Sequence, residues 1–93
     1  MTEILEVNGF DGYTRWYKDG ALHREDGPAV KGPNGFEAWY RNGELHREDG
    51  PAVMCEKWGN GWYLDGVRYS YEKWIEVVDP RYPRLTIYQV FTL

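Results

Sequence analysis

Short runs of alternating apolar and polar residues, separated by glycine-containing turns, cover most of the chain. Asp19-Gly20, Asn42-Gly43 and Asp65-Gly66 each stand between two such runs. These residue pairs accept the positive φ that two-residue hairpin turns need. Further reversals are expected where glycine gathers with proline, aspartate or asparagine, at residues 11–12, 25–28, 34–35 and 48–51. The pattern predicts an antiparallel meander of short strands.

A repeat of 23 residues organises these hairpins. Trp39 follows Trp16 by 23 positions and His46 follows His23 by the same number, and the block Leu-His-Arg-Glu-Asp-Gly-Pro-Ala-Val recurs unchanged. A third copy keeps the Trp-Tyr and Asp-Gly positions, beginning at Trp62, and then loses the block, as a capping repeat does. The units are residues 10–32, residues 33–55 and the partial capping repeat 56–69.

The last third of the chain changes from a strand pattern to a helix pattern. Ser70 is a suitable N-cap, and the apolar residues that follow it share one helical face. Asp79-Pro80 should end this helix, because the residue before a proline avoids the α region. Residues 85–91 alternate again and predict a closing strand. The helix and strand of residues 70–93 should cover one face of the meander or seal its open edge.

The expected fold is therefore mainly β, with one domain over residues 1–93. It consists of an antiparallel meander of 23-residue hairpin repeats, one C-terminal α-helix and a closing strand. The aromatic content of 17% suits a thin architecture without a deep core.

Charge and composition narrow the function. The net charge of −4 argues against a nucleic-acid partner, which would need a basic surface. The single cysteine, Cys55, has no partner for an internal disulfide, so nothing indicates an oxidising compartment. The first residues lack the pattern of a signal peptide, and no apolar run is long enough to cross a membrane. We expect a cytoplasmic protein, in a cell or in an infected host, without a membrane partner.

The repeat resembles the MORN-like repeats, which have a similar period, an aromatic-rich first strand and an Asn-Gly or Asp-Gly turn before a histidine. The matching positions are Trp16, Tyr17, Asp19, Gly20 and His23 to Ala29, with Trp39, Tyr40, Asn42, Gly43 and His46 to Ala52, and half of the pattern at Trp62. The His-Arg-Glu-Asp-Gly-Pro-Ala version looks like a variant of phage, prophage and large-virus proteins. The resemblance implies a hairpin meander with an interaction or scaffold role, and no catalytic reaction.

Two segments with the sequence His-Arg-Glu-Asp, called the HRED blocks below, are the first candidates for chemistry. A functional interpretation is a charged groove that binds a phosphate, a carboxylate or a basic peptide. A structural interpretation is that the histidines bond across their hairpins and the aspartates hold their own turns. Identical copies favour the structural interpretation, because catalysis normally needs one asymmetric constellation. The blocks are His23, Arg24, Glu25 and Asp26, and His46, Arg47, Glu48 and Asp49.

Aromatic side chains are the second candidates. Neighbours on a strand point to opposite faces, so Trp16, Trp39 and Trp62 should line one face of the sheet and the following tyrosines the other. One ladder is expected to be buried under the helix that bears Trp74. The other ladder is either an exposed binding stripe or buried as well.

No catalytic or cofactor motif stands out. Cys55 is expected to be a small buried residue, and the spacing of the HRED carboxylates and histidines fits no familiar zinc site. The glycines fall at hairpin turns, and no phosphate-binding or dinucleotide fingerprint is present. We therefore expect no cofactor, no metal and no catalytic residue.

The first hypothesis is a non-enzymatic binding protein of a phage or mobile element that binds and inhibits a host protein, such as a defence factor. The tryptophans at 16, 39 and 62 and both HRED blocks are its candidate contact residues. The alternative is a module that sequesters a nucleotide or another small anion. A weak hydrolase that uses His23 or His46 is the least favoured hypothesis. A second copy of the chain is a further candidate partner, because a short array leaves sheet edges uncovered.

Overall fold

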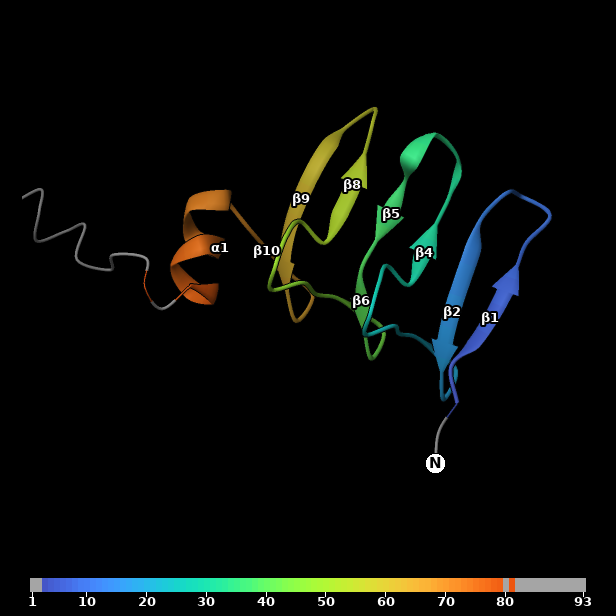
Figure 1. The fold of residues 1–93 in the computed structure, drawn as a ribbon. Coiled ribbons are helices and arrows are strands. Elements are labelled where there is room, and N and C mark those ends of the chain that lie inside the picture. The colour runs from blue at the N-terminus through green and yellow to red at the C-terminus, as the bar shows by residue number, and fades with distance from the viewer. Residues whose placement is uncertain (1–2, 80, 82–93) are drawn as a thin grey trace, which may run out of the picture.

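The computed structural model describes residues 3–79 and residue 81 (Figure 1). It shows an antiparallel eight-stranded sheet in the order β1-β2-β4-β5-β8-β9-β10, with β3 paired to β2, and a separate hairpin of β6 and β7. The predicted meander is confirmed, whereas the predicted closing strand at 85–91 lies outside the described residues. The elements are β1 (Leu5–Asn8), β2 (Thr14–Lys18), β3 (Ala21–Leu22), β4 (Val30–Lys31), the 3-10 turn η1 (Pro33–Gly35), β5 (Glu37–Ala38), β6 (Tyr40–Arg41), β7 (Glu44–Leu45), β8 (Val53–Cys55), β9 (Gly59–Leu64), β10 (Val67–Tyr69) and α1 (Tyr71–Val78).

The hairpin turns have the backbone conformation that their sequences predict. Asn42 and Gly43 have φ values of 52° and 83°, and the Asp-Gly pairs of the other two units are alike. Two consecutive residues at positive φ match the twist of the flanking strands, which is why these pairs close two-residue hairpins.

The sheet forms a thin slab with extents of 57 × 35 × 17 Å and a small core. Ala29 and Ala52, the alanines of the two repeated blocks, are fully buried. The other buried apolar residues of the described chain are Val30, Ala38, Leu64 and Trp74. Short side chains dominate because neighbouring repeats approach each other closely. A core this small leaves much of the cohesion to polar contacts between repeats.

A histidine joins each repeat to the next. The Nδ1 atom of His23 accepts the backbone N–H of Asn42 at 2.9 Å, and Nδ1 of His46 accepts that of Asp65 at the same distance. The preceding leucine carbonyl accepts the next N–H of each turn, at 2.8 Å from Gly43 and Gly66. The expected bond across each histidine's own hairpin is made by the backbone alone, from the N–H of His23 and His46 to the carbonyls of Trp16 and Trp39 at 2.9 Å, whereas the side chains bond to the next repeat. The next repeat stacks so close that the backbone N–H of its turn lies within hydrogen-bond distance of the imidazole Nδ1.

The C-terminal helix closes the array as predicted. The Ser70 hydroxyl accepts the backbone N–H of Lys73 at 3.2 Å, and the helix ends at Val78 before Asp79. The Trp74 ring lies 4.6 Å from the Trp62 ring, and its indole N–H donates to the carbonyl of Arg47 at 2.9 Å. Trp74 thus covers the last tryptophan of the ladder, where the third repeat has lost its own block.

Replacing His23 by alanine should lower the free energy of unfolding by about 1–3 kcal/mol, because the Asn42 N–H is left without its acceptor in a partly buried site. Urea unfolding followed by tryptophan fluorescence measures this. His23→Asn offers a carbonyl oxygen near the Nδ1 position and should recover part of the loss. His46→Ala should cost less, because its bond to Asp65 is exposed. Equal stability of the wild type and His23→Ala would contradict the assignment.

Candidate functional site

The arginines of the HRED blocks are engaged within their own repeats. The Arg24 guanidinium lies 4.0 Å above the Trp16 ring, and that of Arg47 lies 3.8 Å above the Trp39 ring. Each arginine also donates to the aspartate two residues on, at 3.2 and 2.8 Å, and to the carbonyl of Pro28 or Pro51, at 3.2 and 3.1 Å. Stacking and two hydrogen bonds fix each guanidinium on its own repeat and use two of its five N–H donors.

Both nitrogens of each histidine are engaged as well. The Nε2 atom of His23 lies 3.2 Å from a Glu25 oxygen, and Nε2 of His46 lies 2.8 Å from a Glu48 oxygen. Because Nδ1 accepts a backbone N–H, the neutral ring must carry its proton on Nε2 and donate it to the glutamate. A substrate would find no free imidazole nitrogen in this arrangement. The geometry favours the structural interpretation of the HRED blocks, and partner binding by their outer carboxylates stays a prediction.

The aspartates of the blocks serve the arginines. Asp26 and Asp49 accept from the arginine two residues before them, and no hydrogen bond to their own turns is among those that the structure shows. The expected Asx turns therefore give way to ion pairs, because the guanidinium held above the tryptophan lies within reach of the carboxylate.

The tryptophan ladder is covered rather than open. Trp16, Trp39 and Trp62 are all half-buried. Arg24 and Arg47 lie over the first two, and Trp74 and Tyr71 pack on the third at 4.6 and 4.9 Å. The Trp39 indole N–H is buried and has no hydrogen-bond partner in the described chain. The contacts of these rings are with an arginine of the same repeat or with helix α1. Their proposed role as partner contacts stays untested.

Two grooves follow the HRED blocks at equivalent places. One, of about 560 Å³, is lined by Trp16, Lys18 and residues 24–26 together with Ile4 and Glu6. The other groove has a volume of about 360 Å³ and is lined by the equivalent residues of the next repeat: Trp39, Arg41 and residues 47–49. Arg24 and Glu25 of the preceding repeat also line it. Both acidic and basic side chains line each groove, so neither groove presents a field of one sign.

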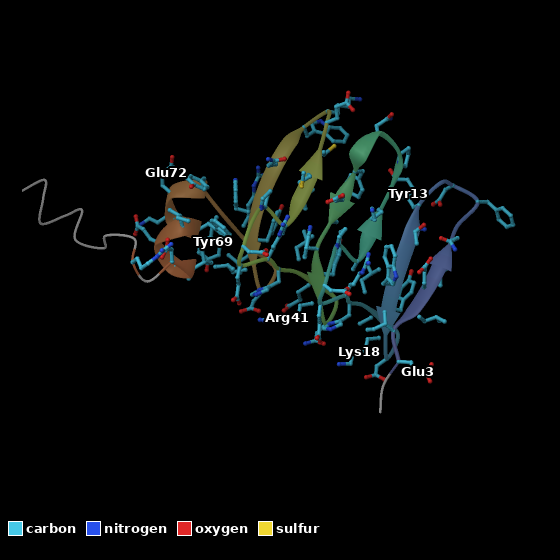
Figure 2. All side chains as sticks on the ribbon, in the orientation of Figure 1. Glu3, Tyr13, Lys18, Arg41, Tyr69 and Glu72 are labelled. Carbon is cyan, nitrogen blue, oxygen red and sulfur yellow. The ribbon has the colours of Figure 1, made fainter. Side chains whose placement is uncertain are left out.

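A third groove lies at the opposite ends of the strands, between the hairpin tips. The tips that join β4 to β5 and β8 to β9 stand side by side there (Figure 1). Tyr13 lies at this edge, while Lys18 and Arg41 lie at the other (Figure 2). The groove has a volume of about 560 Å³ and is called the tip groove below. Its lining residues are Tyr13, Pro33, Asn34, Phe36, Cys55, Glu56, Lys57 and Trp58.

Local contacts hold the first wall of the tip groove in place. An oxygen of Asp11 accepts the Tyr13 backbone N–H at 3.0 Å, and the other accepts from Arg15 at 2.9 Å. The hydrogen bond from Arg15, with that from the Tyr13 N–H, holds the pKa of Asp11 below its ordinary value of 3.8. The Tyr13 ring lies against Gly32, where an added Cβ would come within 2.4 Å of it. The Tyr13 ring meets the Phe36 ring edge to face at 5.7 Å.

The opposite wall carries an exposed tryptophan. Trp58 is 80% exposed, and its ring is touched by the Lys57 ammonium, 5.1 Å from the ring centroid. The 23-residue shift places Gly35 and Gly12 at the equivalent positions of the other repeats. With 80% of its surface in water, the Trp58 side chain packs little against the described chain. Trp58 is not among the contact residues predicted from the repeated tryptophans, although its break with the 23-residue period is visible in the sequence.

No protein-family model matches the chain, and no curated protein or solved structure matches it significantly. The resemblance to MORN-like repeats therefore stays an expectation. In residues 3–79 and 81, no group of three or more His, Cys, Asp or Glu side chains is arranged to hold a metal ion. The same part of the chain has no helix of the length and apolarity needed to cross a membrane.

Arg47→Lys should lower the free energy of unfolding by about 1 kcal/mol, although it keeps the positive charge. A lysine cannot stack its head on Trp39 and at the same time donate in a fork to Asp49 and Pro51. Arg68→Lys, at an exposed arginine of β10, is the matched control and should leave stability unchanged. Urea unfolding of the two variants tests this, and equal midpoints would contradict the role given to Arg47.

Arg15→Gln should raise the pKa of Asp11 toward 3.8, because the charged hydrogen bond is the first cause of its lowering. A carboxyl whose pKa is lower in the folded state contributes stability above its unfolded pKa, and that contribution disappears as pH falls through the folded value. An NMR titration of the Asp11 carboxyl in the wild type and the variant measures the shift. Arg68→Gln is the control, and a pKa that does not move in Arg15→Gln would refute the pairing.

Proposed function

We propose that this protein is a non-enzymatic protein-binding module that contacts its partner through the tip groove. The observation that carries the proposal is Trp58, an indole 80% exposed beside a groove whose other wall is Tyr13 and Phe36. Tryptophan and tyrosine in such a setting are the usual anchors of protein interfaces, because they bury large areas at a small entropy cost.

The repeated and the variable residues lie in different parts of the fold, which supports the tip groove as the contact surface. The residues that repeat are engaged with one another in the HRED blocks and the tryptophan ladder. The hairpin tips are where the repeats differ, with Phe10, Pro33 and Glu56 at equivalent positions. Loops of varied sequence on a rigid scaffold are the common place for binding residues.

The charges of the molecule favour a protein over the alternatives. A net charge of −4 opposes a nucleic acid, whose bases could otherwise stack on Trp58. Sequestration of a nucleotide or another small anion would need free cations, and Arg24 and Arg47 already bind carboxylates and carbonyls of their own repeats. Lys57, the cation at the tip groove, stands beside Glu56.

The narrower form of the proposal is a phage or mobile-element protein that binds and inhibits a host protein in the cytosol, with a defence factor as the candidate target. Small size, acidic charge and the likeness of the repeat to phage and viral variants support it. The partner is then expected in a bacterial host lysate.

Trp58→Ala should abolish recovery of the partner when the tagged protein is used for affinity capture from host lysate. Loss of an anchoring tryptophan typically costs 2 kcal/mol or more, roughly 30-fold in affinity. Because the side chain is exposed, thermal stability should stay within about 0.5 kcal/mol of the wild type. The expected result is one stoichiometric partner, absent with Trp58→Ala.

Glu44→Ala is the control, since this exposed residue lies on β7, in the separate β6–β7 hairpin and not at the tips. It should retain the partner. Equal capture by wild type and Trp58→Ala would remove the tip groove as the binding surface. No captured protein, together with a rise in melting temperature with a small anionic compound, would replace the proposal by the sequestration alternative.

A further inference from the structure

Strand β1 presents an unpaired edge at the N-terminal end of the sheet. It pairs with β2 on one side, from Leu5 opposite Tyr17 to Asn8 opposite Thr14, and with no other strand in residues 3–79 and 81. All four of its residues are exposed. The apolar side chains along this edge are 40% to 111% exposed: Val7 at 40%, Ile4 at 43%, Leu5 at 63% and Phe10 at 111%.

Apart from the Glu6 carboxylate, this edge lacks the features that keep sheet edges from pairing. Proteins protect an edge with charged side chains, above all lysine, with proline, with a bulge or with a covering element. Residues 4–8 contain no proline and no basic residue, and their register with β2 runs without a bulge. At the other end of the sheet, helix α1 packs beside β9 and β10 (Figure 1).

Helix α1 lies too far along the sheet to cover β1. Six strand spacings separate β1 from β10, the terminal strand that α1 contacts, roughly 29 Å at about 4.8 Å each. No described element therefore covers the outer edge of β1.

We propose that a second copy of this chain pairs with β1 in antiparallel register, with Val7 opposite Val7 of the second copy. In this register Glu6 lies opposite Asn8, Leu5 opposite Gly9 and Ile4 opposite Phe10. Every exposed apolar residue of the edge then gains an apolar or small neighbour, and the two sheets join into one across a two-fold axis. Symmetric pairing of this kind closes as a dimer.

The polar residues of β1 select this register. The Asn8 side-chain oxygen accepts from the Thr14 hydroxyl at 2.7 Å, so its NH₂ group is left to donate outward. Glu6, the one charged residue of the strand, has a carboxylate that accepts such a bond. A shift of two residues would place Glu6 opposite Glu6, which like-charge repulsion disfavours. Glu6 and Asn8 thus make the edge complementary to itself.

The proposed dimer forms without the partner, and it would double the number of partner molecules that one assembly can hold. A two-fold axis normal to the sheet reverses the strand direction, so the tip groove of each copy faces the opposite way. If the tip groove binds a partner, one dimer holds two partner molecules on opposite edges of a continuous sheet.

Sedimentation of the purified protein, with its tag at the C-terminus, tests the association without any partner present. Over loading concentrations from ~1 µM to ~1 mM, which bracket weak dimers, the mass should rise toward twice the monomer's 11.0 kDa. Val7→Lys places two ammonium groups opposite each other and should remain monomeric. Val67→Lys, at an exposed valine of the other terminal strand, should dimerise like the wild type. A wild type that stays monomeric, or a Val7→Lys variant that dimerises, overturns the proposal.

Disulfide trapping tests the register. In a Cys55→Ser background, Val7→Cys should form a covalent dimer under mild oxidation, because directly opposed residues have Cα atoms about 4.5–5.5 Å apart. Leu5→Cys should not, since the two Leu5 positions would lie roughly 13 Å apart. Trapping through position 5 and not position 7, or through neither, overturns the proposed pairing. The trapped species does not depend on whether Val7→Lys folds.

Discussion

The hydrogen bond from a turn N–H to the histidine of the preceding repeat is the contact on which the rest of the structure depends. A slab 17 Å thick whose buried apolar residues are mostly small has little hydrophobic burial to fix one hairpin against the next. The His23 ring supplies that connection: it is 3% exposed, and it reaches the Asn42 turn while Glu25 orients its other nitrogen. Because each repeat needs the same reach and the same tautomer, the block recurs unchanged.

At each end of the array, a different element replaces the contacts that a neighbouring repeat makes elsewhere. At the C-terminal end, Trp74 takes over the position above Trp62 that arginine occupies above the other tryptophans, and its indole N–H satisfies the Arg47 carbonyl. At the N-terminal end, β1 supplies the strand pairing of a preceding repeat, with Val7 opposite Arg15 as Val30 is opposite Ala38. It supplies no HRED block and no cover for its own outer edge. Helix α1 thus packs on the C-terminal end, whereas no described element covers the outer edge of β1.

The HRED blocks and the hairpin tips lie at opposite ends of the strands. The HRED side of each repeat is occupied by its internal ion pairs and by stacking of the arginine on the tryptophan. The tip side carries the differences between repeats. Trp58 stands where the other units have glycine, and Tyr13 and Phe36 make the facing wall. A partner that reads the tips would leave the stacking contacts untouched.

The sequence by itself determined the period, the turns and the helix. These depend on local chemistry: positive φ at Asn42 and Gly43, the N-cap at Ser70, and the apolar face that holds Trp74. It did not determine the partner of His23, because that bond joins residues 19 positions apart and depends on how closely two hairpins stack. Nor did it show that Arg47 covers Trp39 while Trp58 is left open. Only the tertiary structure decides which of several similar aromatic rings is covered, because burial is a property of the neighbours that arrive from elsewhere in the chain.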